Sequence, residues 1–113
     1  TVDRIAADFP HWHPLDVEFR VRAAKAASRF ALERMVRDNH DWDVRAHVAR
    51  LTVPTLVIAA DPAHGAMFAG ALADEVLASN TLVTSVVIAG AGHSVHRDDP
   101  AATLQHLLAF ADA

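Results

Sequence analysis

The chain contains no cysteine and no long apolar run, and each absence excludes particular kinds of site or structure. Without cysteine, the 113 residues can form no disulfide, no thiolate nucleophile and no cysteine-ligated zinc site. No apolar run approaches the roughly 20 residues that a membrane-spanning helix needs, and no signal-peptide pattern opens the chain. We therefore expect a cytoplasmic protein with no membrane partner.

Positive charge is also scarce, which weighs against nucleic acid as a partner. The chain carries 10 lysine and arginine residues against 14 acidic ones, for a net charge of −4. The two signs are interspersed, so no basic stripe is present. Hydrophobic residues make up 52% of the chain, which supports a packed core and argues against disorder.

The first part of the chain is expected to be helical after an irregular start. Two prolines and their neighbours favour turns over residues 1–14. A helix is predicted from about Leu15 to Arg37, because apolar residues there recur with helical spacing. The residues of this expected buried stripe are Leu15, Phe19, Ala23, Ala26 and Phe30. A short helix over about 43–50 should follow.

The second part is predicted to be an α/β unit built on two parallel strands. Apolar runs at about 53–60 and 82–89 indicate buried strands, and a helix over about 66–77 can make the right-handed crossover between them. Two strands leave open sheet edges. We therefore expect either a missing N-terminal half that supplies further strands or self-association through the open edge.

The chain is expected to end in a helix that starts after Asp98 or Asp99. Either carboxylate can cap the helix, and Pro100 suits its first turn. The predicted buried stripe of this helix consists of Ala101, Leu104, Leu107, Leu108 and Ala111.

Each predicted strand is followed by a residue that can do proton chemistry. Asp61 follows the first strand, and His93 follows the second after Gly90 and Gly92. In open parallel sheets, reactive groups gather at the carboxyl ends of the strands. An imidazole exchanges protons near neutral pH, and a carboxylate can orient it. Asp61 and His93 are therefore the candidate catalytic acid and base.

These segments resemble parts of the α/β-hydrolase family. The run Val53-Pro54-Thr55-Leu56-Val57-Ile58 is similar to a core strand of these enzymes. The run Ala89-Gly90-Ala91-Gly92-His93-Ser94, followed by Asp98-Asp99-Pro100 and a helix, resembles their catalytic-histidine loop. Residues 10–38 resemble the lid that the family inserts into its core.

The resemblance implies a partial α/β-hydrolase fold, with a lid-type helical segment at 1–42 and the C-terminal part of the core at 43–113. It implies a Ser-His-Asp type of hydrolysis of an ester or related bond, in which His93 is the general base. Gly90 and Gly92 would let the backbone turn so that the ring reaches the site. The implied substrate is a small apolar organic molecule, and neither a cofactor nor a metal is required.

The acid position departs from the family pattern. The commonest version is Gly-Asp-x-Asp, in which the second Asp is catalytic, whereas this chain reads Ala60-Asp61-Pro62-Ala63. Asp61 could serve as the acid in a subgroup with Asp-Pro and a nearby glycine, Gly65. It could also be only a turn residue, with the acid coming from another strand end.

The nucleophile is the larger departure. The family's nucleophile elbow has the form G-x-S-x-G, and no two glycines of this chain bracket a serine in that way. The chain alone should therefore not be catalytically competent. The alternative is a non-catalytic, hydrolase-derived module that binds a partner or forms oligomers.

Other side chains allow less specific interpretations. His93 and His96 have the spacing of metal ligands, but no third ligand accompanies them. Met67 and Phe68 follow the Asp61 loop and are candidate pocket residues. Four aromatic residues could line an apolar pocket or simply pack in the core: Trp12, Phe19, Phe30 and Trp42.

Overall fold

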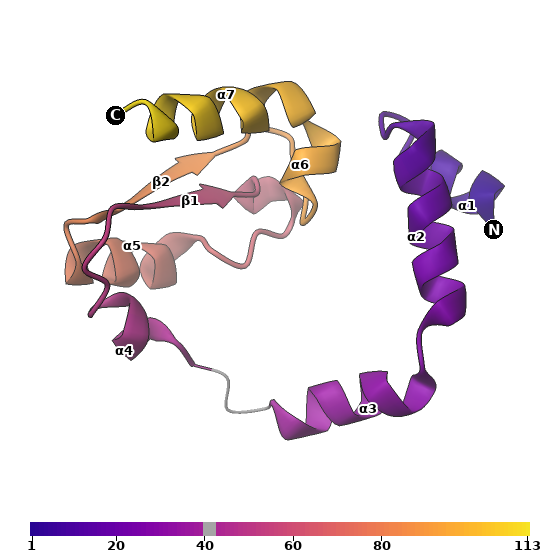
Figure 1. Cartoon of the computed structure of the whole chain (residues 1–113), viewed down its shortest axis with the longest axis horizontal. Coiled ribbons are helices and arrows are strands. Elements are labelled where there is room, and N and C mark those ends of the chain that lie inside the picture. The colour runs from indigo at the N-terminus through magenta and orange to yellow at the C-terminus, as the bar shows by residue number, and fades with distance from the viewer. Residues whose placement is uncertain (40–42) are drawn as a thin grey trace. The chain divides into compact units, whose positions relative to one another are not determined.

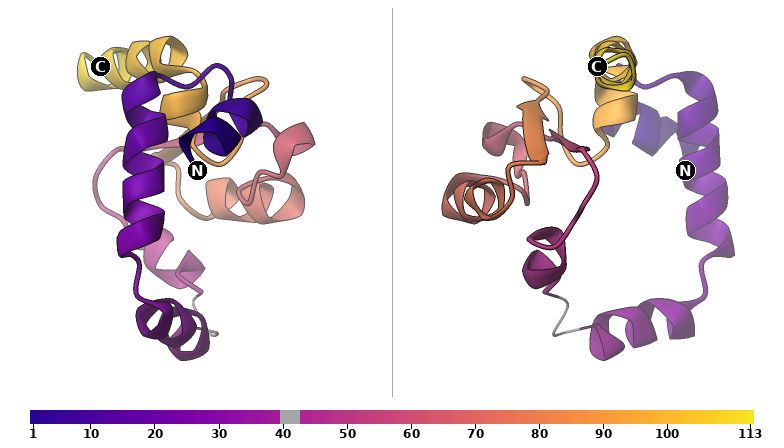
Figure 2. Two further views of the ribbon diagram at one scale, coloured as in Figure 1. Left: turned by 90° about the vertical axis from the view of Figure 1, so that its right-hand side faces the viewer. Right: turned by 60° about the vertical axis from the view of Figure 1, so that its left-hand side comes forward.

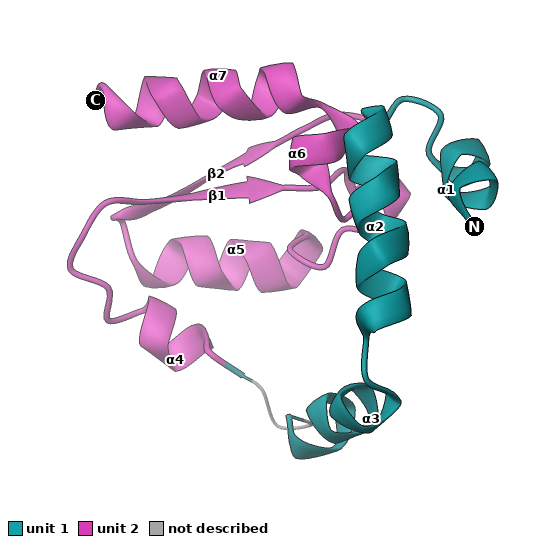
Figure 3. Cartoon of the chain, turned by 45° about the vertical axis from the view of Figure 1, so that its right-hand side comes forward, with its two compact units in different colours: residues 1–43 teal, residues 44–113 magenta. Residues whose placement is uncertain are grey.

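The structure is a computed structural model, and it describes residues 1–39 and 43–113. The chain divides into two compact units, residues 1–43 and residues 44–113 (Figure 3). This division lies next to the boundary expected after residue 42.

The helices and strands follow one another along the chain as Figure 1 labels them. The first unit contains α1 (Val2–Asp8), α2 (Pro14–Ala26) and α3 (Arg29–Asp38). The second contains α4 (Arg45–Val48), β1 (Thr55–Ala59), the 3₁₀ turn η1 (Pro62–His64), α5 (Gly70–Ser79), β2 (Val83–Val87), α6 (Val95–Asp98) and α7 (Pro100–Ala111).

The first unit is organised by the packing of α1 on α2. The irregular start expected for residues 1–14 is wrong for its first half, because Thr1 accepts a hydrogen bond from Arg4 N (3.4 Å) and caps a helix there. Trp12 is buried and stacks on Phe9, with ring centroids 4.2 Å apart. These contacts form a small apolar core in the first unit.

The single helix expected over 15–37 is also wrong, because the chain breaks at Ala27 and Ser28. Both residues have extended backbone, with ψ of 128° and 124°. The Ser28 hydroxyl oxygen accepts from Ala31 N (3.3 Å) and so begins α3 as an N-cap. A serine inside a helical pattern can start a second helix in this way.

The apolar stripe predicted for this segment does not form the buried face. Leu15 and Phe19 are each 55% exposed, and Phe30 is 70% exposed. The buried residues of α2 are Val17 and Val21 instead. Burial follows the side of α2 on which α1 packs, and that side cannot be read from spacing alone.

The second unit is a parallel strand pair between two helices. Thr55 pairs with Val83, and the register continues to Ala59 opposite Val87. In Figure 1, and again when the molecule is turned in Figure 2, the strands lie between α5 and α7. The expected α/β class with a parallel strand pair is confirmed. Among residues 1–39 and 43–113 the sheet has no third strand, so each strand leaves one edge unpaired.

The helices around the strands differ in detail from expectation. The helix predicted from residue 66 begins at Gly70, whose φ of +57° cannot continue a right-handed helix from the residues before it. The start of α7 is as predicted, because Asp99 Oδ1 accepts from Ala102 N (2.9 Å) and Pro100 lies in the first turn.

The buried stripe predicted for α7 is wrong. Leu104 and Leu108 are each 55% exposed, and the buried residue is Thr103. The Thr103 hydroxyl donates to the carbonyls of Asp99 (2.8 Å) and Val95 (3.2 Å), which fixes this side of α7 against α6. The leucines of α7 remain about half exposed, with exposed fractions of 55% for Leu104, 49% for Leu107 and 55% for Leu108.

Asn80 joins two segments at the amino ends of the strands. Its Nδ2 donates to the carbonyls of Val48 (3.0 Å) and Leu51 (2.9 Å), which lead into β1. Its Oδ1 accepts from Leu82 N (3.0 Å), directly before β2. One half-buried amide therefore fixes how both strands begin.

We predict that Asn80→Ala lowers the free energy of unfolding by about 1–3 kcal/mol, because it removes three hydrogen bonds from the side chain to the backbone. Asn80→Asp keeps the acceptor for Leu82 N and loses the donor, so it should recover only part of that loss. Urea unfolding of the full chain measures both effects. An Asn80→Ala variant as stable as the parent would show that this amide does not organise the strands.

Candidate functional site

The candidate site lies where the carboxyl ends of β1 and β2 meet. Backbone pairing continues beyond both strands, because Ile88 N donates to Ala59 O (3.0 Å) and Asp61 N donates to Ala91 O (2.9 Å). The loop after β1 and the loop after β2 are therefore adjacent. The two sequence-predicted site residues, Asp61 and His93, belong to these two loops.

The Asp61 carboxylate joins the two loops. Its Oδ1 accepts from Ala63 N (2.8 Å) and caps the 3₁₀ turn that follows. Its Oδ2 accepts from Gly90 N (2.8 Å), on the loop that follows β2. His64 Nδ1 lies 3.9 Å from the same oxygen, and the Asp61 side chain is 24% exposed. The carboxylate is thus both a local cap and a link across the sheet end.

These contacts favour the ionised form of Asp61. The backbone N–H groups of Gly90 and Ala63 lower the pKa of this carboxyl below its ordinary value of 3.8. Partial desolvation opposes the shift, and the nearby His64 adds a smaller lowering of the same pKa. Asp61 is therefore a carboxylate throughout the neutral pH range.

The two glycines before His93 do different things. Gly90 has a φ of +77°, which a residue with a side chain adopts only with strain, so the expected sharp turn is correct there. The same expectation is wrong for Gly92, whose φ is not positive. Gly92 instead donates its N–H to Asp98 Oδ2 (2.8 Å), and a Cβ added to it would lie 3.4 Å from that oxygen.

His93 follows this turn with its side chain exposed. Its ring makes no hydrogen bond or ion pair with the residues that the structure describes. The contacts of Asp61 go to Gly90, Ala63 and His64 and do not include His93. The structure therefore brings the Asp61 and His93 loops together, and the Asp61 carboxylate binds the backbone of the His93 loop at Gly90.

Asp98 is a residue that sequence reasoning missed. Asp98 and Asp99 were alternatives for the cap of the last helix, and the structure assigns the cap to Asp99. Only one residue can occupy the cap position, and Asp98 instead accepts a hydrogen bond from Gly92 N. That adjacency was the one available signal, and it could not reveal that Asp98 binds Gly92 N.

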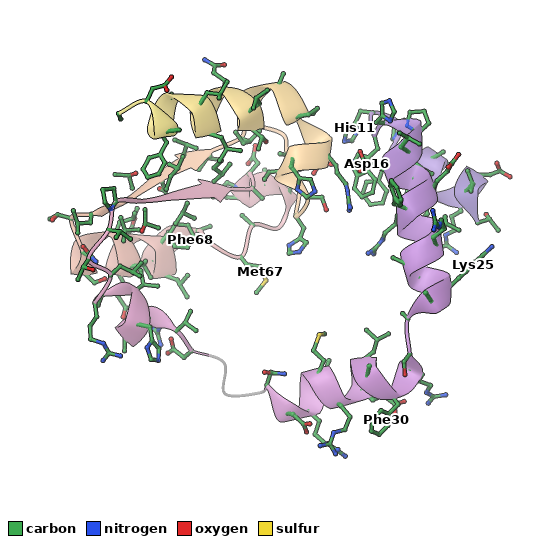
Figure 4. All side chains as sticks on the ribbon, viewed as in Figure 1. His11, Asp16, Lys25, Phe30, Met67 and Phe68 are labelled. Carbon is green, nitrogen blue, oxygen red and sulfur yellow. The ribbon has the colours of Figure 1, made fainter. Side chains whose placement is uncertain are left out.

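The remaining candidates differ in how far they are buried. Trp12 packs in the first unit, as the core interpretation expects, and Phe30 is exposed on α3 (Figure 4). Trp42 lies outside the described residues. Met67 is 84% exposed in the loop before α5, and Phe68 is half-buried (Figure 4). The described residues contain no cluster of three or more side chains suited to a metal ion, around His96 or elsewhere.

The lowered pKa of Asp61 gives folding a defined pH dependence. Since the pKa is depressed in the folded state, the stabilising effect is complete above the ordinary value of 3.8. It is lost as the pH falls through the lower folded-state pKa. Asp61→Asn should therefore be less stable than the parent at pH 5–7, and the difference should shrink progressively below about pH 4.

Urea unfolding of both chains between pH 2.5 and 7 measures this difference. Asp74→Asn is the matched control, because Asp74 is an exposed carboxylate on α5. If the free energies of unfolding of the parent and of Asp61→Asn differed by the same amount at every pH from 2.5 to 7, the result would contradict the assigned hydrogen bonds.

Comparison of the chain with protein-family models, with curated proteins and with solved structures found no match. None of the helices described in residues 1–39 and 43–113 is both long and apolar enough to span a membrane. The function proposed below therefore depends on the geometry of the two loops and on the sequence resemblance.

Proposed function

We propose that this chain is the C-terminal part of an α/β-hydrolase-type enzyme and that His93 is its general base. The observation that carries the proposal is the hydrogen bond from Gly90 N to Asp61 Oδ2 at the shared carboxyl end of two parallel strands. Reactive groups of open parallel sheets gather at this edge. The exposed His93 ring is accessible to a reacting group there.

The chemistry follows from the properties of an imidazole and a carboxylate. A neutral His93 ring would accept the proton of a hydroxyl nucleophile as the nucleophile attacks an ester or related bond. The same ring would then return that proton to the leaving group. Asp61, ionised at neutral pH, is the proposed acid, and each of its oxygens has a second lone pair for a ring N–H.

The nucleophile must come from outside these residues, since the sequence contains no G-x-S-x-G. We assign residues 1–42 to a lid-type segment and residues 43–113 to the C-terminal part of the core. The proposed substrate is a small organic molecule with an apolar portion, and the mechanism uses neither a cofactor nor a metal.

In a parent polypeptide that includes the nucleophile segment, His93→Ala should lower kcat on a p-nitrophenyl ester by about 10³-fold or more, as loss of a triad member does. The 113-residue chain alone should show no turnover above the buffer rate. His96→Ala is the matched control, because it removes an exposed imidazole three residues away. It should leave kcat within about twofold of the parent.

Two results would remove this assignment. The first is a loss smaller than about tenfold for His93→Ala in the parent. The second is hydrolysis by the 113-residue chain alone that survives the same substitution.

A second candidate function, a non-catalytic oligomerisation module, is favoured by the exposed leucine side of α7 and the open strand edges. Exposed apolar surface and unpaired strand edges both favour association. Under this function the chain would join copies of itself or a partner, and His93 would have no chemical role.

For this function we predict that the chain self-associates and that Leu104→Glu/Leu108→Glu shifts it toward monomer. Each of these leucines is 55% exposed, and they lie one helical turn apart, so the charges would disrupt an apolar contact. Sedimentation velocity over a concentration series measures the shift, and Gln105→Glu on the same helix is the control. A chain that stays monomeric at high concentration would exclude association through this surface.

A further inference from the structure

The loop that carries His93 is held by two carboxylates from different parts of the chain. Asp61, after β1, accepts from Gly90 N (2.8 Å). Asp98, at the end of α6, accepts from Gly92 N (2.8 Å). The two bonds engage alternate amides of one short loop. Between them, Ala91 is buried and its carbonyl accepts from Asp61 N (2.9 Å).

The backbone on the other side of His93 is fixed as well. Ser94 O accepts from Arg97 N (2.7 Å) and from Asp98 N (3.0 Å), which forms the first turn of α6. Asp98 therefore binds the loop before His93 through its side chain and the residue after His93 through its backbone. His93, an exposed residue, lies between these backbone contacts.

The role of Asp98 is separate from helix capping. Asp99 caps α7 through Ala102 N (2.9 Å), so Asp98 is not needed for that purpose. A bond from an N–H group to a carboxylate is stronger than a bond between neutral groups. A Cβ at Gly92 would lie 3.4 Å from Asp98 Oδ2, so the loop approaches this carboxylate closely.

We infer that Asp61 and Asp98 form a two-carboxylate clamp whose function is to position His93. The inference rests on the proposed function, because the clamp affects catalysis only if His93 is the general base. A reactive group is most effective when the backbone that carries it is held in place before the reaction. Asp98 is then a positioning residue that acts on the reaction through the His93 loop, and Asp61 has this positioning role in addition to its proposed role as the acid.

The test measures amide hydrogen exchange by NMR in the full ¹⁵N-labelled chain, where Gly90 and Gly92 report on the two bonds. Asp61→Ala should speed exchange at Gly90, and Asp98→Ala should speed exchange at Gly92, each by about tenfold or more. Asp61→Asn and Asp98→Asn keep an acceptor oxygen without its charge and should restore part of the protection. Asp74→Ala on α5 is the control and should change neither glycine.

Protection of the β1 and β2 amides shows whether each variant remains folded. Unchanged exchange at Gly92 in Asp98→Ala, or at Gly90 in Asp61→Ala, would overturn the clamp. The clamp would also be overturned if the β1 and β2 amides lost as much protection as the glycine amide, because the carboxylate would then stabilise the whole second unit and not the His93 loop in particular. No substrate is involved, so these results are independent of whether His93→Ala abolishes hydrolysis in the parent.

If the clamp positions the base, Asp98→Ala in the active parent should lower kcat by about tenfold or more with little change in KM. Asp98→Asn should restore part of that kcat. A change confined to KM, or no change in either constant, would contradict the positioning role. The Asp98 variants are compared only in a parent whose activity is lost in His93→Ala. A failure of the proposed function therefore shows in His93→Ala, before the Asp98 variants are tested.

Discussion

The parallel register of β1 and β2 is the constraint on which the candidate site depends. Because Thr55 pairs with Val83 and Ala59 with Val87, both strands end at the same edge of the sheet. Pairing then extends into the loops, where Asp61 N donates to Ala91 O (2.9 Å). If the same strands were antiparallel, the Asp61 and His93 loops would lie at opposite ends of the strands, and no shared site could form.

Carboxylate–amide bonds turn this shared edge into a defined arrangement. Gly90 can make the turn because its φ of +77° carries no side-chain penalty, and its N–H then faces Asp61. Gly92 and Asp98 repeat the same interaction two residues later. Two hydrogen bonds thus hold the backbone just before His93, while His93 itself is exposed.

The sequence predicts the parts of this fold that depend on local pattern. The strands are marked by continuous apolar runs, and Asp99 with Pro100 marks the start of α7. The sequence does not predict features that depend on which other parts of the chain a residue contacts. The buried side of α2 is set by α1, so Val17 and Val21 are buried while Phe19 is exposed. Side-chain bonds to distant backbone, such as those of Asn80 and Asp98, leave no periodic signal at all.

The central claim is that two parallel strands bring the Asp61 and His93 loops together, and nuclear Overhauser spectroscopy on the labelled chain tests it most directly. The account predicts cross-strand contacts between Val57 and Ser85 and between Ile58 and Val86, together with contacts from the Asp61 amide to Ala91. Contacts linking Ala59 to Val83 and Thr55 to Val87, the pattern of an antiparallel pair, would contradict it.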